Sequence, residues 1–127
     1  MERGQGFSIA GRLRSLRFAW SGLLTLFRTE HNMRIHLAAA FAAVFMGFLF
    51  ALSRMEWIVV AGCIAGVFAA EALNTAVEKL CDALHPDPDP RIGRVKDLCA
   101  AAVLVTATGA LVAGILVFAP HMGAIFR

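Results

Sequence analysis

The chain is short, strongly apolar and weakly basic: it has 127 residues, 59% of them hydrophobic, and a formal net charge of +3. This length leaves no room for a soluble catalytic domain beside a membrane anchor, so we expect a single domain over residues 1–127. The apolar share exceeds the roughly 45–50% that is usual in soluble domains. Basic residues do not alternate with aromatic ones as in nucleic-acid-binding proteins, so we expect no nucleic-acid partner.

The first predicted element is a basic amphipathic surface helix over about residues 8–29. Its apolar residues recur at helical spacing, and its basic and hydroxyl residues recur one position later. Such a helix is typical of a membrane interface, whereas a soluble core helix suits so hydrophobic a chain less well. The apolar stripe is Leu13, Leu16, Trp20, Leu23 and Phe27, and the polar one is Arg14, Arg17, Ser21, Thr25 and Arg28.

Crossing a bilayer takes about 20 helical residues. Two further apolar segments meet this length, and a segment between them reaches it only if its helix continues through Glu71, Asn74 and Glu78. We expect spans over about residues 33–52, 56–84 (with a cytoplasmic extension) and 94–119. A tight external turn over residues 53–56 is predicted to join the first two spans. Prolines should end the second helix near residue 85 and the third before Pro120. The third helix is expected to begin between residues 91 and 96. The predicted fold class is an all-α membrane protein with a surface helix and three transmembrane helices.

Basic residues are concentrated before the first span and between the second and third spans. Because positive residues mark cytoplasmic segments, the N-terminus and the second loop are expected inside. Arg54 and Arg127 lie on the opposite side. The residues on the predicted inner side are Arg3, Arg12, Arg14, Arg17, Arg28, Arg34, Lys79, Arg91, Arg94 and Lys96.

The second span carries ionisable residues, which are costly inside a membrane and are usually functional. Glu71, Asn74, Glu78 and Asp82 fall within about an 80° arc of one helix face. Glu71 lies about 21 Å along the helix from Trp57, and Glu78 about 32 Å. We therefore expect Glu71 below the cytoplasmic headgroups and Glu78 near the aqueous boundary.

Two simpler interpretations compete with an active site. Polar side chains can hold transmembrane helices together, but one or two Asn or Ser residues would suffice for this. An ion or proton pathway should continue toward the outer leaflet, yet the segment from Ile58 to Ile64 is apolar. The polar stripe therefore favours a site that opens to the cytoplasm.

Further polar residues are predicted at the same depth. Glu30 and Arg34 flank the start of the first span, and Arg94, Lys96 and Asp97 precede the third. Carboxylates suit Mg²⁺, and Arg or Lys suits phosphate. The residues thus indicate a metal and phosphate site at the cytoplasmic face, but they do not identify the reaction.

The motif Glu71-x-x-Asn74-Thr-Ala-x-Glu78-x-x-x-Asp82, followed by Gly93-Arg94-x-Lys96-Asp97, closely resembles the prokaryotic diacylglycerol kinase family, which includes the undecaprenol kinases. The resemblance covers about residues 7–119. It implies a homotrimer in the bacterial cytoplasmic (inner) membrane that uses Mg²⁺ and ATP to phosphorylate a lipid alcohol. The product would be undecaprenyl phosphate or phosphatidic acid.

The resemblance also implies a role for each matching residue. Glu71 would be the catalytic base on the lipid hydroxyl, and Glu30 and Glu78 would bind the metal. Because family trimers build sites between neighbouring subunits, the resemblance allows Glu30 and Glu78 to come from different chains. Residues expected to bind substrate are Trp20, Arg34 and Glu71. Residues expected to bind nucleotide are Arg12 (or Arg14), Phe18, Glu30, Asn74, Glu78, Asp87, Asp89, Lys96 and Asp97.

Three features depart from the family pattern or refine it. The chain has no Tyr, so Phe18 stands where Gram-negative diacylglycerol kinases have a tyrosine. The loop with Asp87 and Asp89 is stiffened by three prolines, which puts its nucleotide contacts in question. Residues 30–36 look more like the undecaprenol kinase branch, so undecaprenol is the expected substrate and diacylglycerol the alternative. A non-catalytic membrane assembly or small transporter is the alternative from a different class.

The histidines and cysteines are not expected to bind metal, because their spacing matches no metal site. His31 and His36 are expected to be interfacial or core polar groups. We expect His85 to cap a helix and His121 to be solvated on the outer side.

Overall fold

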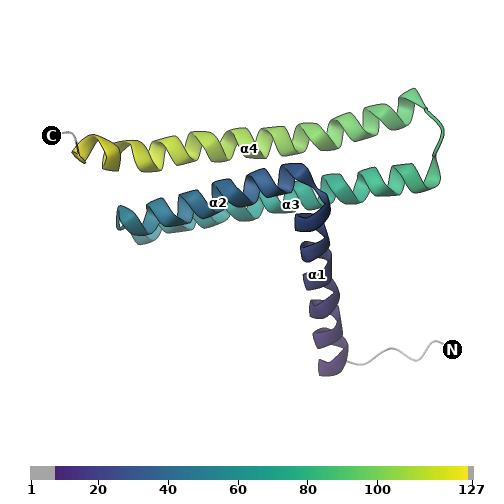
Figure 1. Ribbon diagram of the computed structural model, residues 1–127, viewed down its shortest axis with the longest axis horizontal. Coiled ribbons are helices and arrows are strands. Elements are labelled where there is room, and N and C mark those ends of the chain that lie inside the picture. Colours follow the sequence, from purple (N-terminus) through teal and green to yellow (C-terminus); the bar gives the residue numbers. More distant parts are fainter. Residues whose placement is uncertain (1–7, 126–127) are drawn as a thin grey trace.

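The computed structural model describes residues 8–125, and this range forms four helices and no strand. Figure 1 shows α2, α3 and α4 running alongside one another, while α1 projects sideways from them. Arg3 and Arg127, which contributed to the predicted orientation, lie outside the described residues. The helices are α1 (Ile9–Thr29), α2 (His31–Leu49), α3 (Arg54–Leu84) and α4 (Pro90–Ile125).

Three of these helices, α2, α3 and α4, are long and apolar enough to cross a membrane, which confirms the predicted number of spans. Their large side chains remain exposed: Phe41, Phe45 and Leu116 are 67%, 69% and 71% accessible. An apolar groove of about 540 Å³ also runs between the three helices. Apolar surface on this scale is unfavourable in water but suits the bilayer, where a helix satisfies its own backbone. The chain is therefore an integral membrane protein.

A tight hydrogen-bonded motif ends α2. The amide of Leu52 donates to the carbonyl of Gly47 at 3.0 Å, and the amide of Ala51 donates to that of Phe48 at 3.2 Å. Ala51 has a left-handed φ of 51°. This pair of bonds is the Schellman arrangement, which satisfies the last carbonyls of a helix.

A capping box begins α3 immediately afterwards. The amide of Glu56 donates to the Ser53 hydroxyl at 3.3 Å, and the amide of Ser53 donates to the Glu56 carboxylate at 2.7 Å. Both bonds satisfy amides that a helix start leaves unpaired. The turn therefore lies at residues 50–53, and its predicted position at 53–56 was wrong, because Arg54 to Glu56 already form the first turn of α3.

Asp89 and Pro90 fix the start of α4. The amide of Arg91 donates to Asp89 Oδ1 at 2.8 Å, and Pro90 occupies the first helical position. Proline is favourable there because that position needs no amide hydrogen. The helix thus begins one residue before the predicted window of 91–96.

The prediction that α4 ends before Pro120 was wrong, since the helix continues to Ile125. A proline inside a membrane helix is tolerated where neighbouring groups compensate for the missing bond. Here the next residue, His121, places Nε2 at 2.8 Å from Glu56 Oε1 on α3. Its ring also stacks on Phe50, with centroids 5.9 Å apart. His121 is half-buried, so the expectation of a solvated side chain was also wrong.

Gly47 allows α2 and α3 to approach closely at the same end. A Cβ atom at this position would lie 2.6 Å from Cη2 of Trp57. The indole is held there by Phe48, whose ring centroid is 4.9 Å away. Trp57 also packs against a small buried cluster of Leu52, Val60, Val117 and Phe118.

We predict that Gly47→Ala destabilises the protein by about 1–3 kcal/mol, because the added methyl group overpacks a site already filled by the indole. Thermal unfolding of the purified protein in detergent would show a lower midpoint. Gly109→Ala is the control, because a Cβ atom there meets no atom within 4 Å. Equal midpoints for the two variants would contradict this account of Gly47.

Candidate functional site

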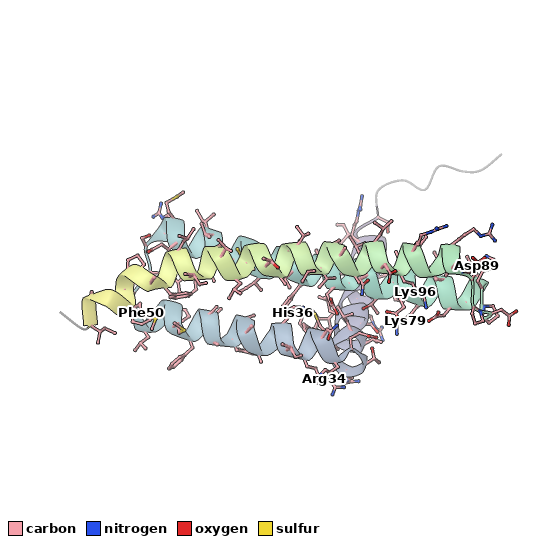
Figure 2. All side chains as sticks on the ribbon, turned by 90° about the horizontal axis from the view of Figure 1, so that it is seen from above. Arg34, His36, Phe50, Lys79, Asp89 and Lys96 are labelled. Carbon is pink, nitrogen blue, oxygen red and sulfur yellow. The ribbon has the colours of Figure 1, made fainter. Side chains whose placement is uncertain are left out.

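Charged side chains gather on the part of the bundle between the α1–α2 junction and the α3–α4 loop. Figure 2 shows Lys79, Lys96 and Asp89 toward this end, whereas Phe50 lies at the opposite end. The residues of the second-span motif belong to the same part, because they occupy the C-terminal half of α3. The structure thus places the polar residues of the α3 motif at a charged end of the bundle, while the opposite end carries the pair of Glu56 and His121.

Exposure increases along the polar face of α3. Glu71 is only 3% accessible, Asn74 is half-buried, and Glu78 and Asp82 are exposed. Exposure thus increases from Glu71 toward the C-terminal end of α3, which is the direction that the sequence predicted. One helix therefore presents carboxylates in different environments to a common site.

Glu71 is the most confined of these carboxylates. Among residues 8–125, its Oε2 atom is buried and has no hydrogen-bond partner. Glu30, Glu78 and His36 are close enough to interact with it electrostatically. A buried polar atom without a partner is costly, and an ionisable group in a membrane helix is usually functional. The structure thus brings together the three glutamates that the sequence singled out.

Glu30 lies at the junction of α1 and α2, where it ends one helix and begins the next. Its side chain does not cap α2. Instead Glu30 Oε1 accepts hydrogen bonds from Lys79 Nζ at 3.1 Å and from Thr29 Oγ1 at 2.9 Å. The Lys79 ammonium, followed by the Thr29 hydroxyl, lowers the pKa of Glu30 and keeps it ionised.

Sequence reasoning missed Lys79 as a site residue. It was counted only as a basic residue of the inner side, because it lies about 100° around the helix from Glu78. Its proximity to Glu30 arises from the way the α1–α2 junction packs on α3, and 49 residues separate the two in sequence. No local pattern could have indicated this contact.

Arg34 closes the same junction. Its Nε donates to the carbonyl of Phe27 at 3.3 Å, and its Nη2 donates to that of Arg28. These carbonyls belong to the last turn of α1, where helix carbonyls lack backbone partners. Arg34 therefore fixes the direction of the chain between α1 and α2.

Lys96 crosses from α4 to α3 and forms an ion pair with Asp82. Its neighbour in sequence, Asp97, is exposed. Glu78 is also close enough to Lys96 to interact with it electrostatically. The structure thus brings Lys96 to the carboxylates of α3.

The two loop carboxylates differ in their contacts. Asp89 Oδ2 lies 2.8 Å from Nη2 of Arg91, and the hydrogen bonds from Arg91 lower the pKa of Asp89. Asp87 is exposed. Asp89 therefore already serves as a helix cap and ion-pair partner, while its predicted nucleotide contact stays a prediction.

The candidate residues of α1 are not brought to the carboxylates within one chain. The first turns of α1 project away from the bundle (Figure 1), and these carry Arg12. Phe18 and Trp20 are 67% and 65% accessible. Contact with the bundle occurs near the end of the helix, where the ring of Phe27 meets that of Phe68 at 5.8 Å.

The arrangement suits a metal ion that arrives with a nucleotide better than a protein-caged metal. Within residues 8–125, no group of three or more His, Cys, Asp or Glu side chains is placed to hold a metal ion. Mg²⁺, however, commonly uses one or two carboxylates together with substrate phosphates. Glu30 and Glu78 offer such carboxylates, and their oxygen chemistry fits this ion.

Comparison with known proteins agrees with the motif. Residues 17–118 match the family model described as prokaryotic diacylglycerol kinase. The chain belongs to this family. It is 38% identical over 109 residues to the undecaprenol kinase of Bacillus subtilis (strain 168), covering 86% of this chain and 89% of that protein. It is 33% identical over 101 residues to the diacylglycerol kinase of Synechocystis sp., covering 79% of this chain and 58% of that protein.

Membership confirms the family that the α3 motif predicted, and it makes the chain a lipid kinase. It supports an enzyme over the alternatives of a non-catalytic assembly or a small transporter. The matched region includes the C-terminal part of α1, all of α2 and α3, and most of α4. The charged end of the bundle therefore belongs to the part of this kinase that the family shares.

We predict that Arg91→Gln raises the pKa of Asp89 toward the ordinary value of about 3.9. In the wild type the lowered pKa means that the pair of Asp89 and Arg91 stabilises the start of α4 at pH values above the pKa of Asp89 in the unfolded chain. That contribution is lost as the pH falls through the lowered value. A ¹³C NMR titration of the carboxyl group would measure the shift, and Arg91→Lys should retain part of the depression. Identical Asp89 titrations in the wild type and Arg91→Gln would refute this account.

Proposed function

We propose that this kinase transfers the γ-phosphoryl group of ATP to a membrane lipid alcohol at the cytoplasmic face, and that the alcohol is undecaprenol. The observation that carries the proposal is the buried, unpartnered carboxylate oxygen of Glu71, with Glu78 and Glu30 nearby. Two observations support undecaprenol over diacylglycerol. Residues 30–36 resemble the undecaprenol kinase branch, and identity is higher to the undecaprenol kinase, at 38% against 33%.

Glu71 is proposed as the general base. Its carboxylate accepts the proton of the lipid hydroxyl while the hydroxyl oxygen forms a bond to the γ-phosphorus and the bond from that phosphorus to the ADP oxygen breaks. Its confined position supports this role, because a membrane lipid presents its hydroxyl close to the bilayer boundary. Because Oε2 accepts no hydrogen bond from residues 8–125, it is available to take the proton.

Glu30 and Glu78 are proposed to hold Mg²⁺ against the nucleotide phosphates, where the ion supplies charge neutralisation. Lys96 is proposed to move from Asp82 to a phosphate oxygen, since an ammonium group binds either anion. Asn74 lies between Glu71 and Glu78 on α3 and can donate hydrogen bonds from its amide. Asp97, Asp87 and Asp89 stay candidate nucleotide contacts at the mouth of the site.

We further propose that the kinase is a homotrimer with its N-terminus and its site on the cytoplasmic side, and that α1 lies in the membrane interface. Support for the interface comes from exposed apolar side chains on α1, such as Leu13 and Leu16 at 63% and 67% accessibility, next to its arginines. The exposed apolar faces of the other helices leave room for lipid or neighbouring subunits. A neighbouring chain could then bring Arg12, Phe18 and Trp20 to the carboxylates.

The purified kinase should transfer label from γ-labelled ATP to undecaprenol faster than to diacylglycerol when both lipids are offered in parallel in mixed micelles with Mg²⁺. Thin-layer separation of the labelled lipids would measure the two rates. A preference for diacylglycerol would overturn the choice of substrate but not the class of reaction. Labelling of neither lipid would refute the proposed function.

Glu71→Gln should lower phosphate transfer by at least about 100-fold, because it removes the base but keeps the shape of the side chain. The thermal midpoint in detergent should change little. Glu56→Gln is the matched control, since it makes the same change at the other end of α3. It is expected to keep its activity at temperatures below its unfolding transition. Normal turnover by Glu71→Gln would exclude Glu71 as the base.

A further inference from the structure

Lys79 holds the carboxylate that is proposed to bind the metal. Its Nζ atom lies 3.1 Å from Glu30 Oε1, and this is the one ion pair of Glu30 within residues 8–125. The two side chains are 59% and 27% accessible, so the pair lies at the surface of the site. Figure 2 shows Lys79 on α3 near the α1–α2 junction. The other site lysine, Lys96, pairs with Asp82 instead.

The contact neutralises one member of a crowded group of anions. Glu30 and Glu78 both interact electrostatically with the buried Glu71. Carboxylates this close repel one another unless a cation is present. Lys79 supplies that cation from the protein itself, and Glu30 stays ionised as a metal ligand must.

Space is available for the ammonium group to move. An open groove of about 460 Å³ lies between α1 and α3, and Lys79 lines its edge beside mostly small apolar residues and the hydroxyl groups of Thr25, Thr29 and Thr75. The lysine side chain is a flexible stem with a point charge that can exchange one anionic partner for another. No other contact holds Nζ in the described part of the chain.

We propose that Lys79 is a built-in cation that occupies Glu30 in the metal-free kinase, is displaced when the divalent ion binds, and then contacts a phosphate oxygen of the nucleotide. This inference rests on the proposed function, in which Glu30 is a metal ligand. A divalent ion on either oxygen of Glu30 would lie close to the ammonium, which is 3.1 Å from Oε1, and would repel it. The ammonium would then need a new anion, and the nucleotide phosphates supply one.

The ion pair of Lys79 with Glu30 affects the order in which metal and nucleotide bind. A free divalent ion that binds Glu30 meets the positive charge of the Lys79 ammonium on the same carboxylate, so the kinase without nucleotide should bind the ion weakly. When the ion arrives with a nucleotide, the released ammonium gains a phosphate partner. Lys79 therefore makes tight metal binding depend on the nucleotide.

Mn²⁺ binding to the nucleotide-free kinase in detergent, followed by the electron paramagnetic resonance signal of the unbound ion, tests the first half of the proposal. Lys79→Gln and Lys79→Met should each bind Mn²⁺ about three- to tenfold more tightly than the wild type, because the competing charge is gone. Lys79→Arg keeps the charge and should stay near the wild type. Unchanged or weaker Mn²⁺ binding in both neutral variants would overturn the proposal. Mn²⁺ binding too weak to detect in the wild type and in all variants would overturn it as well.

Two control variants distinguish the effect of the Lys79–Glu30 ion pair from the effect of removing any nearby positive charge. Arg28→Gln removes a cation two residues from Glu30 in the sequence, and Arg28 makes no ion pair with Glu30 in the described structure. Its Mn²⁺ affinity should match the wild type. In a Glu30→Gln background, Lys79→Gln should bring no gain. An equal gain from Arg28→Gln, or a gain that persists without Glu30, would count against the pair.

Binding of a non-transferable β,γ-methylene analogue of ATP with Mg²⁺ tests the second half. Lys79→Gln should weaken this binding about fivefold, because the phosphates lose one ammonium partner. Unchanged affinity would refute the contact with phosphate. Neither measurement uses a lipid, so they can fail separately from the proposed function. A kinase that meets both expectations but labels neither lipid would refute the lipid reaction alone.

Discussion

The burial of Glu71 within the membrane-spanning helix α3 is the constraint on which the rest of the structure depends. A carboxylate at this depth is costly in lipid, so the chain must surround it with protein and place further polar groups toward the aqueous side. The observed arrangement meets this requirement. Glu71 is 3% accessible, whereas Glu78 and Asp82, further along the same face, are exposed. Within a membrane the backbone amide and carbonyl groups must find their hydrogen-bond partners inside the protein. This is why the described chain is helical almost throughout.

The two ends of the bundle differ in how their residues are used. At the end away from the carboxylates, a Schellman motif and a capping box join α2 to α3 with few residues between them. The pair of Glu56 and His121 ties α4 to the same place, and Trp57 packs against Gly47. These contacts join helix to helix and leave few groups available for a ligand. At the other end, the ion pairs of Glu30 with Lys79 and of Asp82 with Lys96 are partly accessible and use groups that a nucleotide or a metal ion could also bind.

The single chain is incomplete as a folded unit in water. Large side chains of α1, α2 and α4 remain exposed, and the first turns of α1 project away from the other helices (Figure 1). Both features are consistent with an environment of lipid and neighbouring subunits. Within the chain, packing is most extensive where α3 meets α4 and next where α2 meets α3. There the Gly47 position and the small buried cluster of Leu52, Val60, Val117 and Phe118 supply close contact.

The sequence by itself determined the membrane character, the number of spans and the polar face of α3. These properties follow from the composition of each segment and from the 100° rotation per residue of an α-helix. Neither depends on how the helices pack together. The family was also accessible, because its motif lies within one helix and the start of the next. Local patterns located the helix ends less well: α4 continues through Pro120, and the first turn lies at residues 50–53. Proline and serine can each occupy several positions near a helix end, and tertiary contacts select one of them.

Only the tertiary structure decided which charged groups meet. The pairs Lys79 with Glu30, Lys96 with Asp82 and His121 with Glu56 each join different segments of the chain. Such pairs depend on how helices dock and rotate against one another, which residue spacing does not specify. The sequence identified Glu71 and its neighbours as carboxylates on one face of α3. The packing of the α1–α2 junction on α3 decided that Glu30 joins them and that a lysine from α3 neutralises it.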